Sequence, residues 1–471
     1  MFIQPIPQVQ TFVDNLNQCV IELSGDKGLT KAQRCWMVFV LMGIVVTGKL
    51  CWLAYERSDC FGRFGEAGLR WIFKKSQMPW HLLLRASVLV IIRRYGISKG
   101  SLVIDDSEKR RSKNTKKIHG VQKVKDKVSS GFIQAQEFVL MVLVTDKVTI
   151  PVDFEFYISD PKQVEWKKQY KLAKKNKSKP PKKPAKNPKY PSKPELALSM
   201  LERFVENFPA IKILLVAADA LYGGKSFMNK ASAIQQIPQV ISQLKSNQII
   251  MSKNKPVKVS TYFNRLQPVK TQITIRGGEK KTVYLNAARL RVKAHGKKRF
   301  VIALKYEGET EYRYIVATNL AWRYKDIVQG YSLRWLVEVF IEDWKQHGGW
   351  NRLTKHQGEE GSYRGMILSL MCDHLTIHHE DQKTLIENKQ PCLPVGCVIE
   401  RLKMSATVET IEELLRDENP VERFDQVVSI MKARLPERGS SRHMNGRDLG
   451  RQEATKSLKY REEPRSSAKA A

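Results

Sequence analysis

Acidic residues in three separate segments of this 471-residue chain could together bind metal ions. They are the adjacent pair Asp105 and Asp106, then Asp219, then Glu338. Carboxylate oxygens are hard ligands of the kind that Mg²⁺ prefers. Two divalent ions about 3.5–4 Å apart can activate a nucleophile and relieve the charge that develops when a phosphodiester is cleaved. If the fold unites these carboxylates, they indicate metal-dependent phosphoryl transfer.

Residues 331–350 are predicted to form one helix, because their polar and apolar side chains separate at helical spacing. One side, within an arc of roughly 60°, carries Tyr331, Arg334, Glu338 and Lys345. The opposite side is an apolar stripe that should face a core, formed by Leu333, Leu336, Val337, Phe340 and Trp344. An ordinary amphipathic helix with solvated charges would show the same separation, so the pattern alone does not assign a function.

The spacing Y-x2-R-x3-E-x6-K in this segment resembles the signature helix of DDE transposases from bacterial cut-and-paste insertion sequences. In that family the Glu is the third metal-binding carboxylate, which here is Glu338. The resemblance further implies that the phosphates of a transposon end are bound by Tyr331, Arg334 and Lys345.

The same resemblance selects the two upstream aspartates. The family places its first catalytic Asp at the end of the first strand, just before a small hydroxyl residue, which maps onto Asp106 before Ser107. The strand–Asp–small–Leu–Tyr–Gly pattern at Asp219 resembles the second catalytic motif. Both aspartates also have a structural alternative, as a turn residue or a helix cap. The implied catalytic and metal-binding residues are Asp106, Asp219 and Glu338.

The elements that must position these carboxylates are predicted to be strands. Residues 101–105 form a short apolar run that ends in the aspartate pair, and residues 137–145 and 149–158 are the next β-rich runs. The run 213–218 is typical of a fully buried parallel strand, and Asp219 follows it. A strand followed by a hairpin is how the ribonuclease-H-like fold begins. We therefore expect an α/β protein with a ribonuclease-H-like mixed sheet and helices, a β-rich insertion and a helical N-terminal domain.

A β-rich stretch over residues 249–319 separates Asp219 from Glu338. A β insertion at this place is a hallmark of the transposase subgroup that the chain resembles. In relatives an aromatic residue on the last strand of the insertion stacks on a flipped base near the cleavage site. Tyr312 and Tyr314 lie on one face of that strand, and the position of Tyr314 matches better. We expect Tyr314 to contact DNA, although an aromatic pair on a strand can also be simple packing.

The chain is expected to divide into a helical N-terminal DNA-binding domain, two parts of the catalytic core around the insertion, a helical C-terminal region and a disordered tail. The N-terminal domain covers residues 1–97. The two parts of the catalytic core cover 98–235 and 323–382, and the insertion between them covers 236–322. The C-terminal region covers 383–435 and the tail covers 436–471. The resemblance implies that the N-terminal domain recognises the terminal inverted repeat of the transposon. A packing domain without DNA contacts is the alternative.

A strong positive charge points to a polyanionic partner. The formal net charge is +34, which favours nucleic acid over a membrane surface. Residues 167–193 contain 12 lysines, 5 prolines and no acid, so they are predicted to form a solvated, extended loop that binds the DNA backbone or merely solubilises the protein. We expect double-stranded DNA as the partner, no membrane, and, from the resemblance, a homodimer in the DNA complex.

Seven scattered cysteines suggest reduced thiols, and hence a cytoplasmic, nucleoid-associated protein. The N-terminus does not read as a signal peptide, and the apolar run 35–48 is too short to span a membrane. A zinc site is disfavoured because no C-x2-C pair accompanies the group Cys372, His374, His378 and His379. These residues are expected on a helix with a buried Cys and surface His.

The function implied by the resemblance is cut-and-paste transposition. Such an enzyme nicks the transposon end, cleaves the second strand, in relatives through a DNA hairpin, and transfers the 3′-OH to target DNA. It would use two Mg²⁺ ions, for which Mn²⁺ can substitute. The alternatives are a ribonuclease-H-like nuclease or resolvase and a DNA-binding repressor on an inactive transposase scaffold. An intact carboxylate triad argues against the inactive scaffold.

Overall fold

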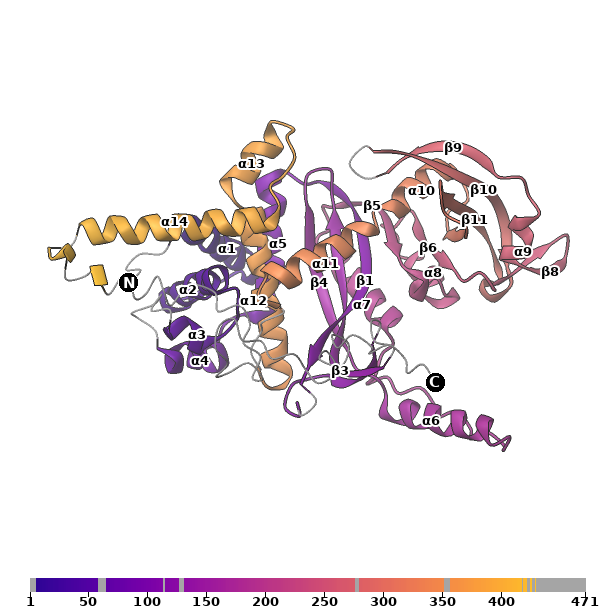
Figure 1. The fold of residues 1–471 in the computed structure, drawn as a ribbon, viewed down its shortest axis with the longest axis horizontal. Coiled ribbons are helices and arrows are strands. Elements are labelled where there is room, and N and C mark those ends of the chain that lie inside the picture. The colour runs from indigo at the N-terminus through magenta and orange to yellow at the C-terminus, as the bar shows by residue number, and fades with distance from the viewer. Residues whose placement is uncertain are drawn as a thin grey trace, which may run out of the picture.

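The computed structural model describes residues 6–57, 65–112, 115–126, 131–275, 279–350 and 356–416, with 418–421, 424, 425 and 428. A twelve-stranded mixed sheet runs through it in the order β2-β3-β1-β5-β6-β12-β11-β10-β7-β8, and β4 pairs with β3 while β9 pairs with β10. Figure 1 shows helices α1–α5 on one side of the molecule and the strands around β9–β11 on the other. This is the mixed α/β architecture that the sequence predicts.

Helices precede the first strand, as expected for the N-terminal region. They are α1 (Pro7–Ser24), α2 (Lys31–Thr47), α3 (Trp52–Arg57), α4 (Glu66–Lys75) and α5 (Trp80–Tyr95). Helix α2 begins with a capping box, in which Thr30 and Gln33 each accept a hydrogen bond from the other's backbone N–H. Residues 36–46 of α2 are all buried, which explains their continuous apolar character. DNA binding by this region remains a prediction.

The sheet is built around β1 (Lys99–Arg111). It pairs antiparallel with β3 (Phe132–Val144) and parallel with β5 (Lys212–Ala218). Strands β2 (Val121–Lys125) and β4 (Thr149–Tyr157) both pair antiparallel with β3. An antiparallel β-hairpin next to a parallel strand is the arrangement expected of a ribonuclease-H-like core.

The β-rich region after Asp219 extends the same sheet. Strand β6 (Val240–Leu244) pairs parallel with β5, and β12 (Arg313–Ala317) pairs antiparallel with β6. The remaining strands are β7 (Ile249–Ser252), β8 (Lys255–Lys258), β9 (Val269–Thr274), β10 (Lys280–Val292) and β11 (Lys297–Tyr306). The short helices here are η1 (Ala220–Tyr222), α8 (Lys225–Ala231), α9 (Val259–Asn264) and η3 (Lys293–His295).

The sheet separates two hydrophobic cores, because neighbouring residues of a strand point to opposite sides. Val103 of β1 lies in the core that contains α10 (Tyr324–Ser332) and α11 (Trp335–His347). The next residue, Ile104, lies in the core that contains α7 (Lys193–Asn207). We call these two sides of β1 the α11 face and the α7 face.

The prediction of one helix over residues 331–350 is wrong. The chain forms α10 and then α11. Between them the backbone hydrogen bonds join residues three apart instead of four: the N–H of Leu333 donates to the Gly330 carbonyl, and that of Arg334 donates to the Tyr331 carbonyl. Such a tight stretch ends one helix axis and starts another. As a result α10 packs on β5 and β6, whereas α11 lies across β1 and β3. The predicted apolar stripe of α11 is nevertheless buried, at Val337, Phe340 and Trp344.

Strand β1 is much longer than the predicted strand over residues 101–105. Its pairing with β3 continues to Arg111, whereas β5 ends opposite Ile104. Asp105 and Asp106 therefore lie in the middle of a strand, immediately beyond the point where β5 stops.

The lysine-rich segment is not a wholly extended loop, because α6 (Pro161–Lys175) includes its first part. The chain then returns beside this helix, where the ring N–H of Trp166 donates to the Pro181 carbonyl over 2.9 Å and Gln163 donates to the Pro184 carbonyl over 2.9 Å. Figure 1 shows α6 projecting from the body of the molecule. We call residues 161–192 the lysine arm.

Helices α12 (Gly358–Ile377), α13 (Glu380–Glu387) and α14 (Val395–Leu415) follow α11 in the chain. His374 is fully buried, between Ser87 and the Pro151 carbonyl, and His378 is 2% exposed, so the expectation of surface histidines is wrong. No described helix is long and apolar enough to cross a membrane. The predicted disordered tail, 436–471, lies outside the described residues.

Candidate active site

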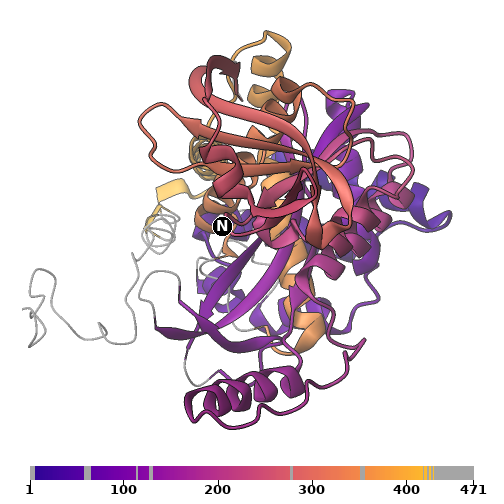
Figure 2. The same ribbon diagram turned by 90° about the vertical axis from the view of Figure 1, so that its right-hand side faces the viewer.

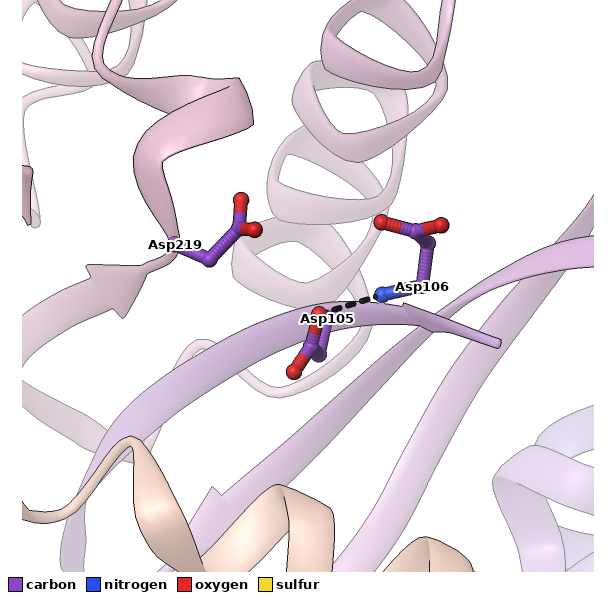
Figure 3. Close-up of side chains that lie close together, drawn as sticks. All are labelled: Asp105, Asp106 and Asp219. Carbon is purple, nitrogen blue, oxygen red and sulfur yellow. Dashed lines mark hydrogen bonds between the residues drawn. The ribbon is translucent and has the colours of Figure 1, made fainter. Parts of the chain in front are cut away.

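Three aspartates meet where β5 ends beside β1. Asp219 follows the last residue of β5, and its carboxylate accepts a hydrogen bond from the backbone N–H of Leu221 over 2.7 Å. One carboxylate oxygen each from Asp105, Asp106 and Asp219 lies within 4.8 Å of the others. Figure 3 shows Asp219 at the end of one strand and the other two aspartates on its neighbour. This set of hard oxygen donors fits a divalent cation.

Burial makes the Asp105 carboxylate difficult to ionise. Its side chain is 13% exposed. Burial, together with the negative charges of Asp219 and Asp106, raises its pKa to about 7. Two groups lower the pKa of Asp105. The backbone N–H of Asp106 donates a hydrogen bond to the carboxylate over 2.8 Å, and the Arg334 guanidinium attracts its negative charge. A divalent cation would favour the ionised carboxylate, so the electrostatics also fit a cation site.

The two adjacent aspartates face opposite sides of β1, as Figure 3 shows. Asp105 lies on the α11 face, and its Oδ2 is 3.5 Å from Nη1 of Arg334. Asp106 lies on the α7 face, and its Oδ2 accepts a hydrogen bond from Nζ of Lys193 over 2.6 Å. The sequence motif selects Asp106, but the strand register directs Asp105 toward the helix that carries Glu338.

Glu338 is connected to the aspartates through Arg334. The guanidinium of Arg334 forms ion pairs with both Glu338 and Asp105. The Glu338 side chain is 36% exposed. Within the described part of the chain, the close carboxylate group contains the three aspartates and does not include Glu338. The positive charge that lies between Asp105 and Glu338 in this structure is therefore a guanidinium.

Lys345 lies on the same helix as Glu338, whereas Tyr331 belongs to the preceding helix and is buried. Lys345, in the last turn of α11, donates to Oγ of Ser107 over 2.6 Å and so contacts β1 two residues beyond Asp105. Tyr331 belongs to α10 and is 8% exposed, and burial raises its pKa to about 12. Cζ of Arg334 lies 5.9 Å from the centroid of the Tyr331 ring. Tyr331 thus supports Arg334 and offers little surface to a ligand.

Tyr314 is buried, contrary to the expectation that its ring contacts DNA. It is 5% exposed and packs on Phe263 at a ring-centroid distance of 6.2 Å. The aromatic side of β12 faces the same core as α7, so hydrophobic packing explains this residue.

Lys193 is a site residue that no sequence motif identifies. Its Nζ donates to Asp106 and, over 2.6 Å, to Oε1 of Glu137, so it balances two carboxylates on the α7 face. The capping box formed by Ser192 and Glu195 marks the start of α7 and could have placed Lys193 at a helix N-terminus. Its partner Asp106 lies 87 positions away, and no local pattern predicts that pairing.

Comparison with known families finds a match over about half of this chain. Residues 26–261, about half of the chain, match the sequence model of a family described as "DDE superfamily endonuclease". The matched region contains β1 and β5 with the three aspartates, and it ends before α10 and α11. No curated protein matches the chain.

Proposed function

The chain belongs to the DDE superfamily of endonucleases, and from this membership we propose that it is a cut-and-paste transposase. It would cleave DNA at transposon ends and transfer the resulting 3′ ends into target DNA. The observation that carries the proposal is the position of Asp105, which lies close to Asp219 and faces Arg334 at the start of α11. That helix carries Glu338 and Lys345, and Arg334 lies directly before it. This arrangement supplies three carboxylates and two cations to one side of β1.

Enzymes of this superfamily use divalent metals, and the acidic cluster has the ligand type that such ions require. We assign the metal ligands to Asp105, Asp219 and Glu338, with Asp105 in place of Asp106 because it faces α11. Bound Mg²⁺ ions would activate the nucleophile and stabilise the charge on the transferring phosphoryl group. Asp106 keeps the ammonium of Lys193 paired on the opposite side of the strand.

Arg334 and Lys345 are proposed to hold DNA phosphates next to the carboxylates. In this structure Arg334 is paired with two carboxylates. When Asp105 and Glu338 turn to a cation, the guanidinium becomes available for a bidentate contact with a phosphate. Lys345 donates a hydrogen bond to Ser107 of β1. Its ammonium is therefore placed where it could contact a DNA phosphate close to the one proposed for Arg334.

The lysine arm is proposed to bind the DNA backbone at a second place, at a distance from the active site. The contacts of Gln163 and Trp166 tie the returning chain to α6, and Nζ of Lys183 lies 5.7 Å from the Trp166 ring centroid. The lysines of residues 167–189 are all exposed. A projecting element of this charge can neutralise several phosphates without reading base sequence.

A second copy of the chain is proposed to dock on α14. This helix exposes an apolar row at the four-three-four spacing of a coiled-coil seam, formed by Met404, Val408, Ile411 and Leu415 at 64%, 45%, 43% and 73% exposure. Residues 405–418 hold five acidic residues and one basic residue in a chain of net charge +34. Their charge repels DNA, which leaves the apolar row of this helix available to a protein partner.

The dimer proposal is tested by light scattering on the protein bound to DNA ends. The double variant Val408→Glu with Ile411→Glu should give a monomer mass where the wild type gives a dimer. Trp71→Glu on α4, which replaces a residue that is 62% exposed outside the row, is the matched control. A dimer that survives the double variant would overturn the assignment of α14.

The proposed function is tested with the DNA that flanks this gene. If the protein is a transposase, we expect inverted repeats on both sides of the gene, bracketed by a short direct duplication. Labelled duplexes carrying one repeat are incubated with the protein, Mg²⁺ and a target plasmid. We expect cleavage at the repeat boundary and joining of the labelled 3′ end to the plasmid. Cleavage without joining would indicate a nuclease or resolvase, and binding without cleavage would indicate a repressor, and either result would overturn the proposal.

A further inference from the structure

The α11 face of β1 carries a serine and two basic residues beyond Asp105. Ser107, Lys109 and Arg111 follow at alternate positions and therefore point to the same side of the strand. Each step of two residues advances about 6.8 Å along a strand. Lys345 joins this row from α11 through its hydrogen bond to Ser107. The row leads away from the proposed metal ligands along a single line.

Lys109 is the unusual member of this row. It is 6% exposed, and its Nζ is buried without a hydrogen-bond partner among the described residues. The nearest aromatic ring belongs to Trp350, whose centroid lies 5.1 Å from Nζ. A buried ammonium without a carboxylate or hydrogen-bond partner destabilises a fold. No hydrogen bond or ion pair with a described residue therefore accounts for the position of the Lys109 amine.

The groups around Lys109 are cations and neutral side chains. Burial lowers its pKa to about 6, and the charges of Arg111 and Lys345 act in the same direction. Gln136, the residue opposite Lys109 on β3, accepts a hydrogen bond from Nε of Arg111 over 2.9 Å. No acidic group within the described ranges contributes to the pKa of Lys109. The buried amine of Lys109, which has no hydrogen-bond partner among the described residues and lies near the charges of Arg111 and Lys345, marks a site that an anion would complete.

We propose that Lys109, Arg111 and Lys345 form a second phosphate-binding subsite for the DNA backbone, adjacent to the proposed metal site, and that Lys109 takes up a proton when the phosphate binds. The inference rests on the proposed function in one respect, which is that DNA is the substrate. The four-carbon stem of Lys109 lets its amine turn from Trp350 toward a ligand. A phosphate among the three side chains favours the charged amine, so DNA binding is coupled to protonation.

This coupling has a definite sign. Below pH 6 Lys109 is already charged in the free protein, and the phosphate contact is fully available. As the pH rises above 6, binding must recruit a proton, and the contribution of Lys109 to affinity falls by at most about tenfold per pH unit for one proton. The affinity gained from Lys109 should therefore be larger at pH 6 than at pH 8.

The test compares Lys109→Met with the wild type as full chains in EDTA, so that metal binding does not enter. Fluorescence anisotropy with a duplex of about 30 base pairs gives Kd as a function of salt and pH. We expect weaker binding, a salt slope lower by about one unit, and a difference from wild type that shrinks between pH 6 and pH 8. Lys99→Met is the matched control, since Lys99 is exposed on the same strand with the same alternation.

Equal affinity and equal salt slope for Lys109→Met and the wild type at both pH values would overturn the subsite. Methionine fills a similar volume without charge, so urea denaturation should show a variant at least as stable as the wild type. If the methionine variant does not fold, Lys109→Gln provides the same comparison. The proposed function fails separately: wild-type protein that does not bind or cleave the flanking DNA would refute it, whatever Lys109 does.

Discussion

Replacing Asp105 by asparagine should stabilise the metal-free protein, although we propose Asp105 as a metal ligand. Burial raises the pKa of this carboxyl from 3.8 to about 7 on folding. At about 1.4 kcal/mol per pKa unit, this rise corresponds to about 4 kcal/mol of destabilisation once the carboxyl is ionised. Asparagine keeps the shape of the side chain and removes the buried charge.

The effect should depend on pH in a specific way. Between pH 4 and pH 7 the folded protein retains a proton on Asp105 that the unfolded chain has lost, so stability falls as the pH rises through this window. Asp105→Asn should therefore match the wild type near pH 4 and exceed it by about 4 kcal/mol at pH 8. Added Mn²⁺ should narrow this gap, because it binds the protein with all three carboxylates more tightly than the variant and so stabilises it more.

Urea denaturation in EDTA measures the free energy of unfolding of the variant and the wild type at pH 4 and at pH 8. Asp106→Asn is the control, because removal of the Lys193 partner should destabilise the protein at pH 8. The reasoning is refuted if Asp105→Asn is less stable than the wild type at pH 8. It is also refuted if the gain is the same at both pH values, since a gain without pH dependence cannot come from the charge.

Two further predictions concern DNA contacts. Arg334→Ala and Lys345→Ala should each weaken binding to cleaved ends and lower the salt slope by about one unit, measured by anisotropy in Mg²⁺; an unchanged slope for both would show that neither side chain contacts a phosphate. Changing the lysines of residues 167–189 to glutamine should reduce DNA affinity without changing the free energy of unfolding, because these side chains are exposed. A large loss of stability in that variant would show that the lysine arm is part of the folded core.

The sequence predicts the parts of the fold that depend on local periodicity. The apolar stripe of α11 and the buried strand before Asp219 are both present, because helical and strand spacing determine which side chains can be buried together. The break between α10 and α11 lies beside a close contact between segments that are distant in sequence. A Cβ on Gly330 would lie 2.5 Å from Cδ2 of Leu215, so α10 packs closely on β5 there, and no local pattern encodes that approach.

In the candidate site, too, some features follow from local periodicity and others depend on contacts between distant segments. Periodicity cannot choose between Asp105 and Asp106, because both faces of β1 are covered by hydrophobic cores. The choice requires knowing that α11 covers one face and α7 the other. The pairing of Lys193 with Asp106 and the burial of Tyr314 likewise depend on strand order and helix placement, which single-sequence patterns do not contain.

The central claim is that Asp105, Asp219 and Glu338 bind the metal ions that cleave DNA. Cysteine substitution tests it most directly, because a thiolate is a poor ligand for Mg²⁺ and a better one for Mn²⁺. Cleavage of a labelled duplex that carries the transposon end is measured for Asp105→Cys and Asp106→Asn in each metal. We predict that Asp105→Cys is inactive in Mg²⁺ and partly restored by Mn²⁺, while Asp106→Asn still cleaves in Mg²⁺. Cleavage by Asp105→Cys in Mg²⁺ at the wild-type rate, together with loss of cleavage in Asp106→Asn, would contradict the claim.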